Sequence, residues 1–134
     1  MKSEEKATTQ EKVDKFAYLS PMLNSALTEM REFSKKKQDG IVSATKIKIL
    51  NRLLSDIRDV LADEESVNYL DVLNEEDLPQ NSDAVLVLGQ YRAALDSYKT
   101  AHYQYLSGYG NIWITKEFLQ SRNGEYDDVE EDVD

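Results

Sequence analysis

The stretch from residue 43 to residue 64 places the strongest constraint on how this chain can fold. At about 100° per residue, its apolar side chains gather on one side of a helix and cover nearly half of its circumference. This arc is wider than the narrow seam of a two-stranded coiled coil. We therefore predict a central helix with neighbours on more than one side, which begins at the N-cap Ser43. The arc consists of Ile47, Ile49, Leu50, Leu53, Leu54, Ile57, Val60 and Leu61.

Other segments show apolar residues at helical spacing too. We expect a short helical segment over residues 13–19 and a new helix that starts with Ser20 as N-cap and Pro21 as first residue. The alternative is one long helix bent at Pro21. The longest clean helix is predicted over residues 83–107, where the apolar pattern is continuous.

The segments on either side of the longest helix are less regular. A short third helix is expected around residues 66–73, and Leu78 in the following loop is expected to return to the core. Residues 111–114 have strand propensity, but we find no partner strand, and an isolated strand is not viable. We therefore predict Asn111 as the N-cap of a last helix, with Trp113 packing on the other helices.

These elements predict an all-α fold, an antiparallel bundle of four to five helices with a short third helix and a disordered acidic C-terminal tail. The length of 134 residues fits one domain with a core of its own. We expect the bundle domain to cover residues 11–122. The polar residues 1–10 and the acidic residues 123–134 are expected to be disordered, because they contain too little apolar surface to fold.

Charge is distributed unevenly along the chain. The formal net charge is −10, but the last ten residues alone hold seven acids and no base. The remaining residues hold nineteen acids and sixteen bases, so the body of the protein is near neutral. A DNA mimic would need its acids spread over a folded face, and this distribution argues against one. Within the body, residues 31–52 are mostly basic and residues 56–83 are mostly acidic.

Composition excludes several classes of protein. The chain has no cysteine, so disulfides and thiolate metal sites are ruled out. No run approaches the roughly 20 apolar residues of a membrane span, and the charged N-terminal residues do not resemble a secretory signal. We therefore expect a soluble cytoplasmic protein with no membrane partner.

Tyrosine is the most unusual component of the sequence. Six of the eight tyrosines lie between residues 91 and 126, and three of them repeat every seven residues along one helical line. Such a line is typical of a recognition surface, since tyrosine is enriched at interface cores. It is equally typical of a seam at the edge of a core, with each ring buried and each hydroxyl in water. The candidate partner-binding residues are Tyr91, Tyr98 and Tyr105 on this line, Tyr103 beside it, and Tyr109 in a loop.

A group of basic residues offers a different function. These side chains lie at the end of the expected second helix and on the central helix, where they could contact phosphates. The alternative is a solvated patch that also complements the helix dipole. The acidic net charge argues against general nucleic-acid binding, although the acidic tail could compete with a polyanion for this patch. The candidates are Lys35, Lys36, Lys37, Lys48 and Arg52.

Catalytic signals in the sequence are weak. The one histidine, His102, lies on the apolar stripe of the longest helix, which is typical of a packed side chain. Two carboxylate pairs three residues apart, Glu29 with Glu32 and Asp56 with Asp59, have the spacing with which all-helical nucleotide pyrophosphohydrolases hold Mg²⁺. Glu32 lies almost opposite its helix's apolar stripe, however, so the two pairs do not converge. We expect no catalytic residue, no metal and no cofactor.

The sequence therefore favours a small non-enzymatic protein–protein interaction module, an adaptor or inhibitor, that binds its partner through an apolar or tyrosine-lined helical face. Its opposed basic and acidic segments also favour self-association. The first alternative is a regulator of nucleic-acid transactions that acts through residues 31–52. The second is a Mg²⁺-dependent nucleotide hydrolase.

Overall fold

The computed structural model describes residues 6–123, and the chain divides into two compact units. The larger unit is Lys15–Tyr98, and the smaller one combines residues 6–14 with residues 99–123. The described chain is mostly helical and carries one two-stranded sheet. The predicted acidic tail, apart from Asn123 at its start, and residues 1–5 of the predicted disordered N-terminus lie outside the described residues.

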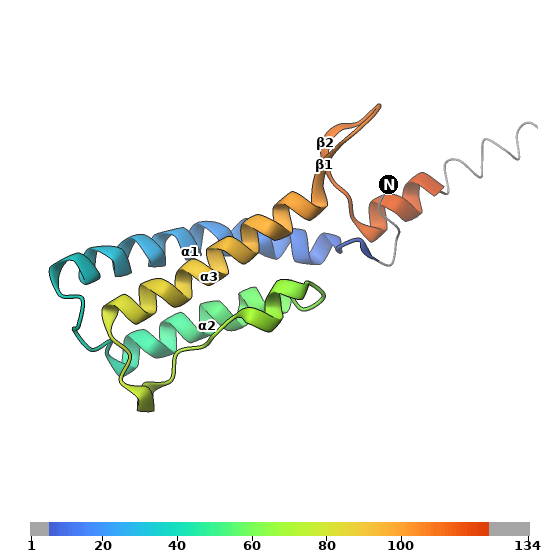
Figure 1. The fold of residues 1–134 in the computed structure, drawn as a ribbon. Coiled ribbons are helices and arrows are strands. Elements are labelled where there is room, and N and C mark those ends of the chain that lie inside the picture. The colour runs from blue at the N-terminus through green and yellow to red at the C-terminus, as the bar shows by residue number, and fades with distance from the viewer. Residues whose placement is uncertain (1–5, 124–134) are drawn as a thin grey trace, which may run out of the picture. The chain divides into compact units, whose positions relative to one another are not determined.

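Helix α1 spans Gln10–Lys36 as one continuous helix with Pro21 inside it (Figure 1). The long-helix alternative is thus confirmed, and the predicted start at Ser20 is wrong. An interior proline removes one backbone hydrogen bond and costs about 3 kcal/mol. Apolar residues on both sides of the proline compensate, because Leu19 and Leu23 are both buried in the core of the larger unit.

Helix α2 spans Ala44–Val60, and its predicted N-cap is confirmed. The Ser43 hydroxyl accepts a hydrogen bond from the backbone N–H of Lys46 at 3.2 Å. The predicted apolar arc is mostly buried, with one exception. Ile49 remains 53% exposed, at the edge of the arc. The helix ends before the acidic residues 63–65, which would be unfavourable at a helix C-terminus.

The segment 61–80 contains two short 3₁₀ helices, η2 (Glu65–Tyr69) and η3 (Glu75–Asp77), where one short third helix was expected around residues 66–73. A short helix is confirmed at the start of that range. Its continuation to residue 73 is wrong, because a side chain of α2 takes the hydrogen bonds of the Leu73 backbone. The Asn51 amide donates to the Leu73 carbonyl at 2.7 Å and accepts from the Leu73 N–H at 3.3 Å. Leu73 is buried, whereas Leu78 is 63% exposed with a φ of 50°, so the expected return of Leu78 to the core is also wrong.

Asn51→Asp is expected to release this segment and to lower the free energy of unfolding by about 1–3 kcal/mol. A carboxylate cannot donate to the Leu73 carbonyl, and it would place a charge against that oxygen. Amide hydrogen exchange of residues 62–80 should become faster. Asn74→Asp is the matched control, because Asn74 acts there only as an acceptor, from the Glu76 N–H. Equal effects of the two changes would contradict this account.

Helix α3 spans Asn81–His102. The sequence predicts Ser82 or Asp83 as its N-cap, which is wrong, because the helix begins at Asn81 and Asp83 lies inside its first turn. From there the Asp83 carboxylate accepts from the Gln80 N–H at 2.8 Å, as in a capping box. Arg92 joins α3 to α1 by donating to Ser20 Oγ at 3.1 Å and to Asn24 Oδ1 at 2.8 Å. Within the larger unit α1, α2 and α3 lie side by side (Figure 1). Fully buried side chains of this unit include Leu23, Leu54, Ile57, Leu61, Leu88, Tyr91 and Leu95.

The smaller unit contains an antiparallel hairpin of β1 (Tyr103–Leu106) and β2 (Gly110–Trp113), in which Tyr103 lies opposite Trp113. The prediction of helix through residue 107 and of Asn111 as an N-cap is therefore wrong. Strand-forming residues on both sides of a tight turn outweigh the helical pattern. Gly108 and Gly110 have φ values of 87° and 80°, which other residues rarely adopt.

The two ends of the described chain meet in the smaller unit. Thr8 forms a parallel bridge with Thr115, and the Lys116 N–H donates to the Thr8 carbonyl at 2.8 Å. Ala7 packs with Ile114 and Leu119. A last helix over residues 116–123 follows Thr115, whose hydroxyl caps it by accepting from the Phe118 N–H. Residues 7 and 8 are thus buried and paired, in contrast to the disorder expected of the N-terminus.

Candidate functional site

A groove runs along the larger unit between α1 and α2, and we call it the α1–α2 groove. It consists of three adjoining hollows with volumes of about 210, 310 and 190 Å³. The first and second hollows share Leu19 and Asp56. The second and third share Ala26, Glu29, Ile49 and Leu50, so the three form one continuous depression.

The groove is lined by one row of side chains from each helix. Residues three and four apart lie on the same side of a helix, which brings each row into line. Both rows end in charged residues; the α1 row is uncharged between its ends, whereas the α2 row also carries charge at Arg52 and Asp56. The α1 row is Lys15, Tyr18, Met22, Ser25 and Glu29, and the α2 row is Lys46, Ile49, Arg52, Asp56 and Asp59.

Three large apolar side chains along the groove are open to solvent. Tyr18, Met22 and Ile49 are 74%, 54% and 53% exposed, although each is a large apolar side chain. Leu19 and Leu50 are buried and lie beneath them in the groove lining. Single exposed apolar residues are ordinary on any protein, but several within one groove make it a candidate binding surface.

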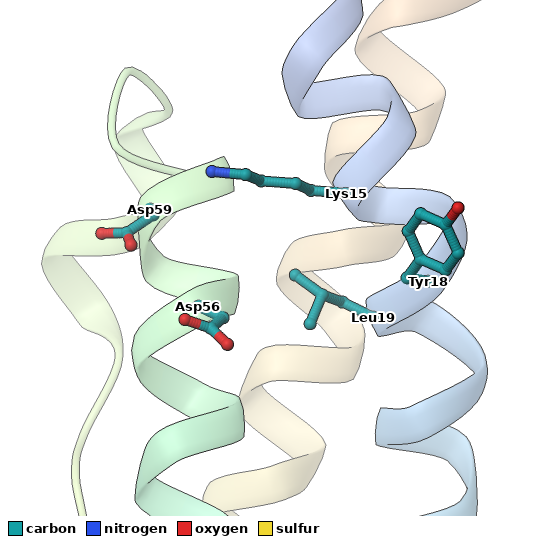
Figure 2. Close-up of a pocket in the computed structure, with 5 residues that line it drawn as sticks. All are labelled: Lys15, Tyr18, Leu19, Asp56 and Asp59. Atoms are coloured by element: carbon teal, nitrogen blue, oxygen red, sulfur yellow. The ribbon is translucent and has the colours of Figure 1, made fainter.

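Charges of opposite sign face each other at both ends of the groove. At one end Lys15 of α1 lies with Asp56 and Asp59 of α2. Figure 2 shows the Lys15 side chain reaching from α1 towards Asp59, with Leu19 between the helices. At the other end Glu29 of α1 shares its hollows with bases of α2. Each row therefore reverses its charge from one end to the other.

The five candidate tyrosines are divided between the two units. Tyr91 and Tyr98 are buried in the larger unit, where the Tyr91 hydroxyl donates to the Asp71 carbonyl at 2.8 Å. The other three belong to the smaller unit. Tyr103 contacts the Trp113 ring at 5.3 Å, Tyr109 meets Phe118 edge-on at 5.1 Å, and Tyr105 is 71% exposed.

The candidate polyanion-binding residues are exposed but spread over two helices and a turn. Lys35 and Lys36 lie in the last turn of α1, where Lys35 pairs with Glu32 at 3.1 Å, and Lys37 follows the helix. Lys48 and Arg52 are on α2. Of these five residues, only Arg52 lines the groove.

The carboxylates do not form a metal site. Among residues 6–123, no group of three or more histidine, cysteine, aspartate or glutamate side chains could hold a metal ion. Lys15 and Arg52 occupy the same parts of the groove as the carboxylates. His102 is only 2% exposed, at the C-terminal end of α3, so its ring has almost no access to solvent.

The sequence analysis missed Tyr18 and Met22 as surface residues. The signal that would have found them is a second pair of apolar residues at helical spacing, Tyr18 and Met22, which is visible only if α1 continues through Pro21. On α2, the position of Ile49 at the edge of the apolar arc was the corresponding sign that this residue is exposed.

Comparison with known proteins gives no assignment. No protein-family model, no curated protein and no solved structure matches this chain. None of the helices in the described part of the chain is long and apolar enough to cross a membrane.

Proposed function

We propose that this chain is a small non-enzymatic protein–protein interaction module, an adaptor or inhibitor, whose α1–α2 groove receives a helical surface of another protein chain. The observation that carries the proposal is that three large apolar side chains, Tyr18, Met22 and Ile49, are exposed in one groove with charged residues at its ends. Amphipathic helices commonly dock in such grooves through apolar side chains three and four residues apart.

The proposal treats α1, α2 and α3 as an antiparallel bundle in which α3 covers one side of the α1–α2 pair. Two contacts support this arrangement: Arg92 of α3 binds α1, and Arg58 of α2 donates to the Tyr91 hydroxyl of α3 at 3.4 Å. The opposite side of the pair then lacks a covering helix. From Lys15 to Glu29 this side is about 21 Å long, which matches roughly four turns of a docked helix.

The alternatives receive less support from the same residues. A nucleic acid would meet Asp56 and Asp59 at one end of the groove, where phosphates are repelled. A hydrolase would need several carboxylates on one metal, and lysine and arginine lie among the groove's acids. We propose the cytoplasm as the compartment, since a cysteine-free chain suits a reducing environment.

Photo-crosslinking tests this proposal directly. The photoreactive amino acid benzoylphenylalanine is placed at Met22, and the protein is irradiated in the cells that normally produce it. We expect discrete adducts larger than the monomer, and we expect Ile49→Glu in the same chain to abolish them. Both side chains are exposed, so neither change should disturb the fold.

The matched control is benzoylphenylalanine at Leu86, which is 69% exposed on α3 and does not line the groove. It should give no discrete adduct. Equal crosslinking from Leu86 and Met22, or none from Met22, would show that the groove is not an interaction surface.

A further inference from the structure

We propose that the α1–α2 groove pairs with the same groove of a second copy of this chain. This inference rests on the proposed function and names the partner. Its basis is the arrangement of charge around the groove, because that arrangement is complementary to itself.

The groove carries its charges at four corners. At the first end, the α1 corner is positive through Lys15 and the α2 corner is negative through Asp56 and Asp59. At the second end the signs are exchanged, with Glu29 on α1 and the bases Lys46 and Arg52 on α2. Neighbouring corners therefore differ in sign in both directions.

Two identical surfaces that face each other are related by a two-fold axis in the plane between them. If that axis runs along the helices, each α1 row meets the α2 row of the second copy at the same end. Lys15 then faces aspartates, and Glu29 faces bases. If the axis runs across the helices, each row faces the same row of the second copy, which runs in the opposite direction. Lys15 then faces Glu29 of the second copy. Both axes place opposite charges together at every corner.

The exposed apolar side chains of the groove suit the same pairing. Tyr18 and Met22 lie between Lys15 and Glu29 on α1, and Ile49 lies between Lys46 and Arg52 on α2, so two facing grooves would bury six such side chains among charged ones. An apolar centre with a polar rim is the usual construction of a protein interface. A partner with one sign of charge would be repelled at two of the four corners, whereas a second copy is repelled at none.

Exchanging the charges at all four corners provides the test. The exchanged variant has the same net charge as the natural chain, and it is again complementary to itself. Natural chain and natural chain should pair, and variant and variant should pair. A mixed pair would have like charges at every corner, which opposes binding strongly. The variant carries Lys15→Glu, Glu29→Lys, Lys46→Glu, Arg52→Glu, Asp56→Lys and Asp59→Lys.

Sedimentation equilibrium is expected to show that each pure protein is a dimer. Native mass spectrometry of an isotope-labelled mixture should then show about tenfold fewer mixed dimers than random pairing gives. Circular dichroism checks that the variant is folded. If it is not folded, Ile49→Glu in the natural chain gives a second test, since it should produce a monomer while Leu86→Glu leaves the dimer intact.

Other results would overturn the inference. Mixed dimers at the random level would show that the corner charges do not guide pairing. A monomeric natural chain would exclude pairing with a second copy. In that case the Met22 crosslinks test the proposed function separately. Adducts with a different protein would support an interaction module, and a lack of adducts would contradict the proposed function as well.

Discussion

Tyr91→Ala is expected to lower the free energy of unfolding by about 3–5 kcal/mol, the usual cost of removing a buried aromatic ring. Tyr91 is completely buried in the larger unit. Its hydroxyl donates to the Asp71 carbonyl at 2.8 Å and accepts from Arg58 at 3.4 Å. The change therefore leaves a cavity, and the Asp71 carbonyl and the Arg58 guanidinium each lose a hydrogen-bond partner.

The measurement is urea-induced unfolding followed by circular dichroism, at one protein concentration for all variants. Tyr105→Ala is the matched control, because Tyr105 lies on the same seven-residue tyrosine line but is 71% exposed. It should change the free energy by less than about 0.5 kcal/mol. Tyr91→Phe separates the hydroxyl from the ring and should cost about 1–2 kcal/mol. Similar losses for Tyr91→Ala and Tyr105→Ala would contradict the burial described above.

Pro21→Ala is expected to raise the free energy of unfolding by about 1–3 kcal/mol, because a proline inside a helix lacks the N–H donor and clashes with the preceding turn. Pro21 is exposed in the interior of α1, so its replacement removes no core packing. Alanine restores the missing backbone hydrogen bond and has the highest helix propensity.

Thr28→Ala is the control for this prediction. Thr28 is another exposed residue within α1, where its hydroxyl donates to the Asn24 carbonyl at 2.9 Å. Its replacement loses that hydrogen bond and gains helix propensity, so the net change should stay within about 0.5 kcal/mol. Thermal and urea unfolding of both variants measure the difference. A loss of stability in Pro21→Ala would contradict this account of the cost of proline in α1.

The sequence predicted those parts of the fold that depend on neighbouring residues. The apolar arc and serine cap of α2 were recognisable because both signals lie within one helix. The hairpin was missed because residues 103–106 fit a helical pattern as well as a strand. Only their pairing with residues 110–113 decides between the two. The segment 61–80 was misassigned because Asn51, more than twenty residues from Leu73, supplies its hydrogen bonds.

The candidate site was harder to predict than the fold. Whether an apolar face is a core or a binding surface depends on what packs over it, and periodicity does not contain that information. Tyr91 and Tyr98, which have the regular seven-residue spacing, are buried in the core, where the Tyr98 ring contacts Phe16. The less regular Tyr18 and Met22 remained at the surface. Charge was more informative, since the opposite signs of the two halves of α2 are visible in the sequence.

The bridge between Thr8 and Thr115 has a consequence for the order in which the protein forms during synthesis. The larger unit is one continuous segment, Lys15–Tyr98, so all of its residues are available while later residues are still being added. The smaller unit needs residues from both ends of the described chain and must wait until residue 115 and the helix after it have left the ribosome. Contacts between such distant residues form slowly. A chain that stops after residue 98 should therefore retain the structure of the larger unit and leave residues 6–14 without their partners.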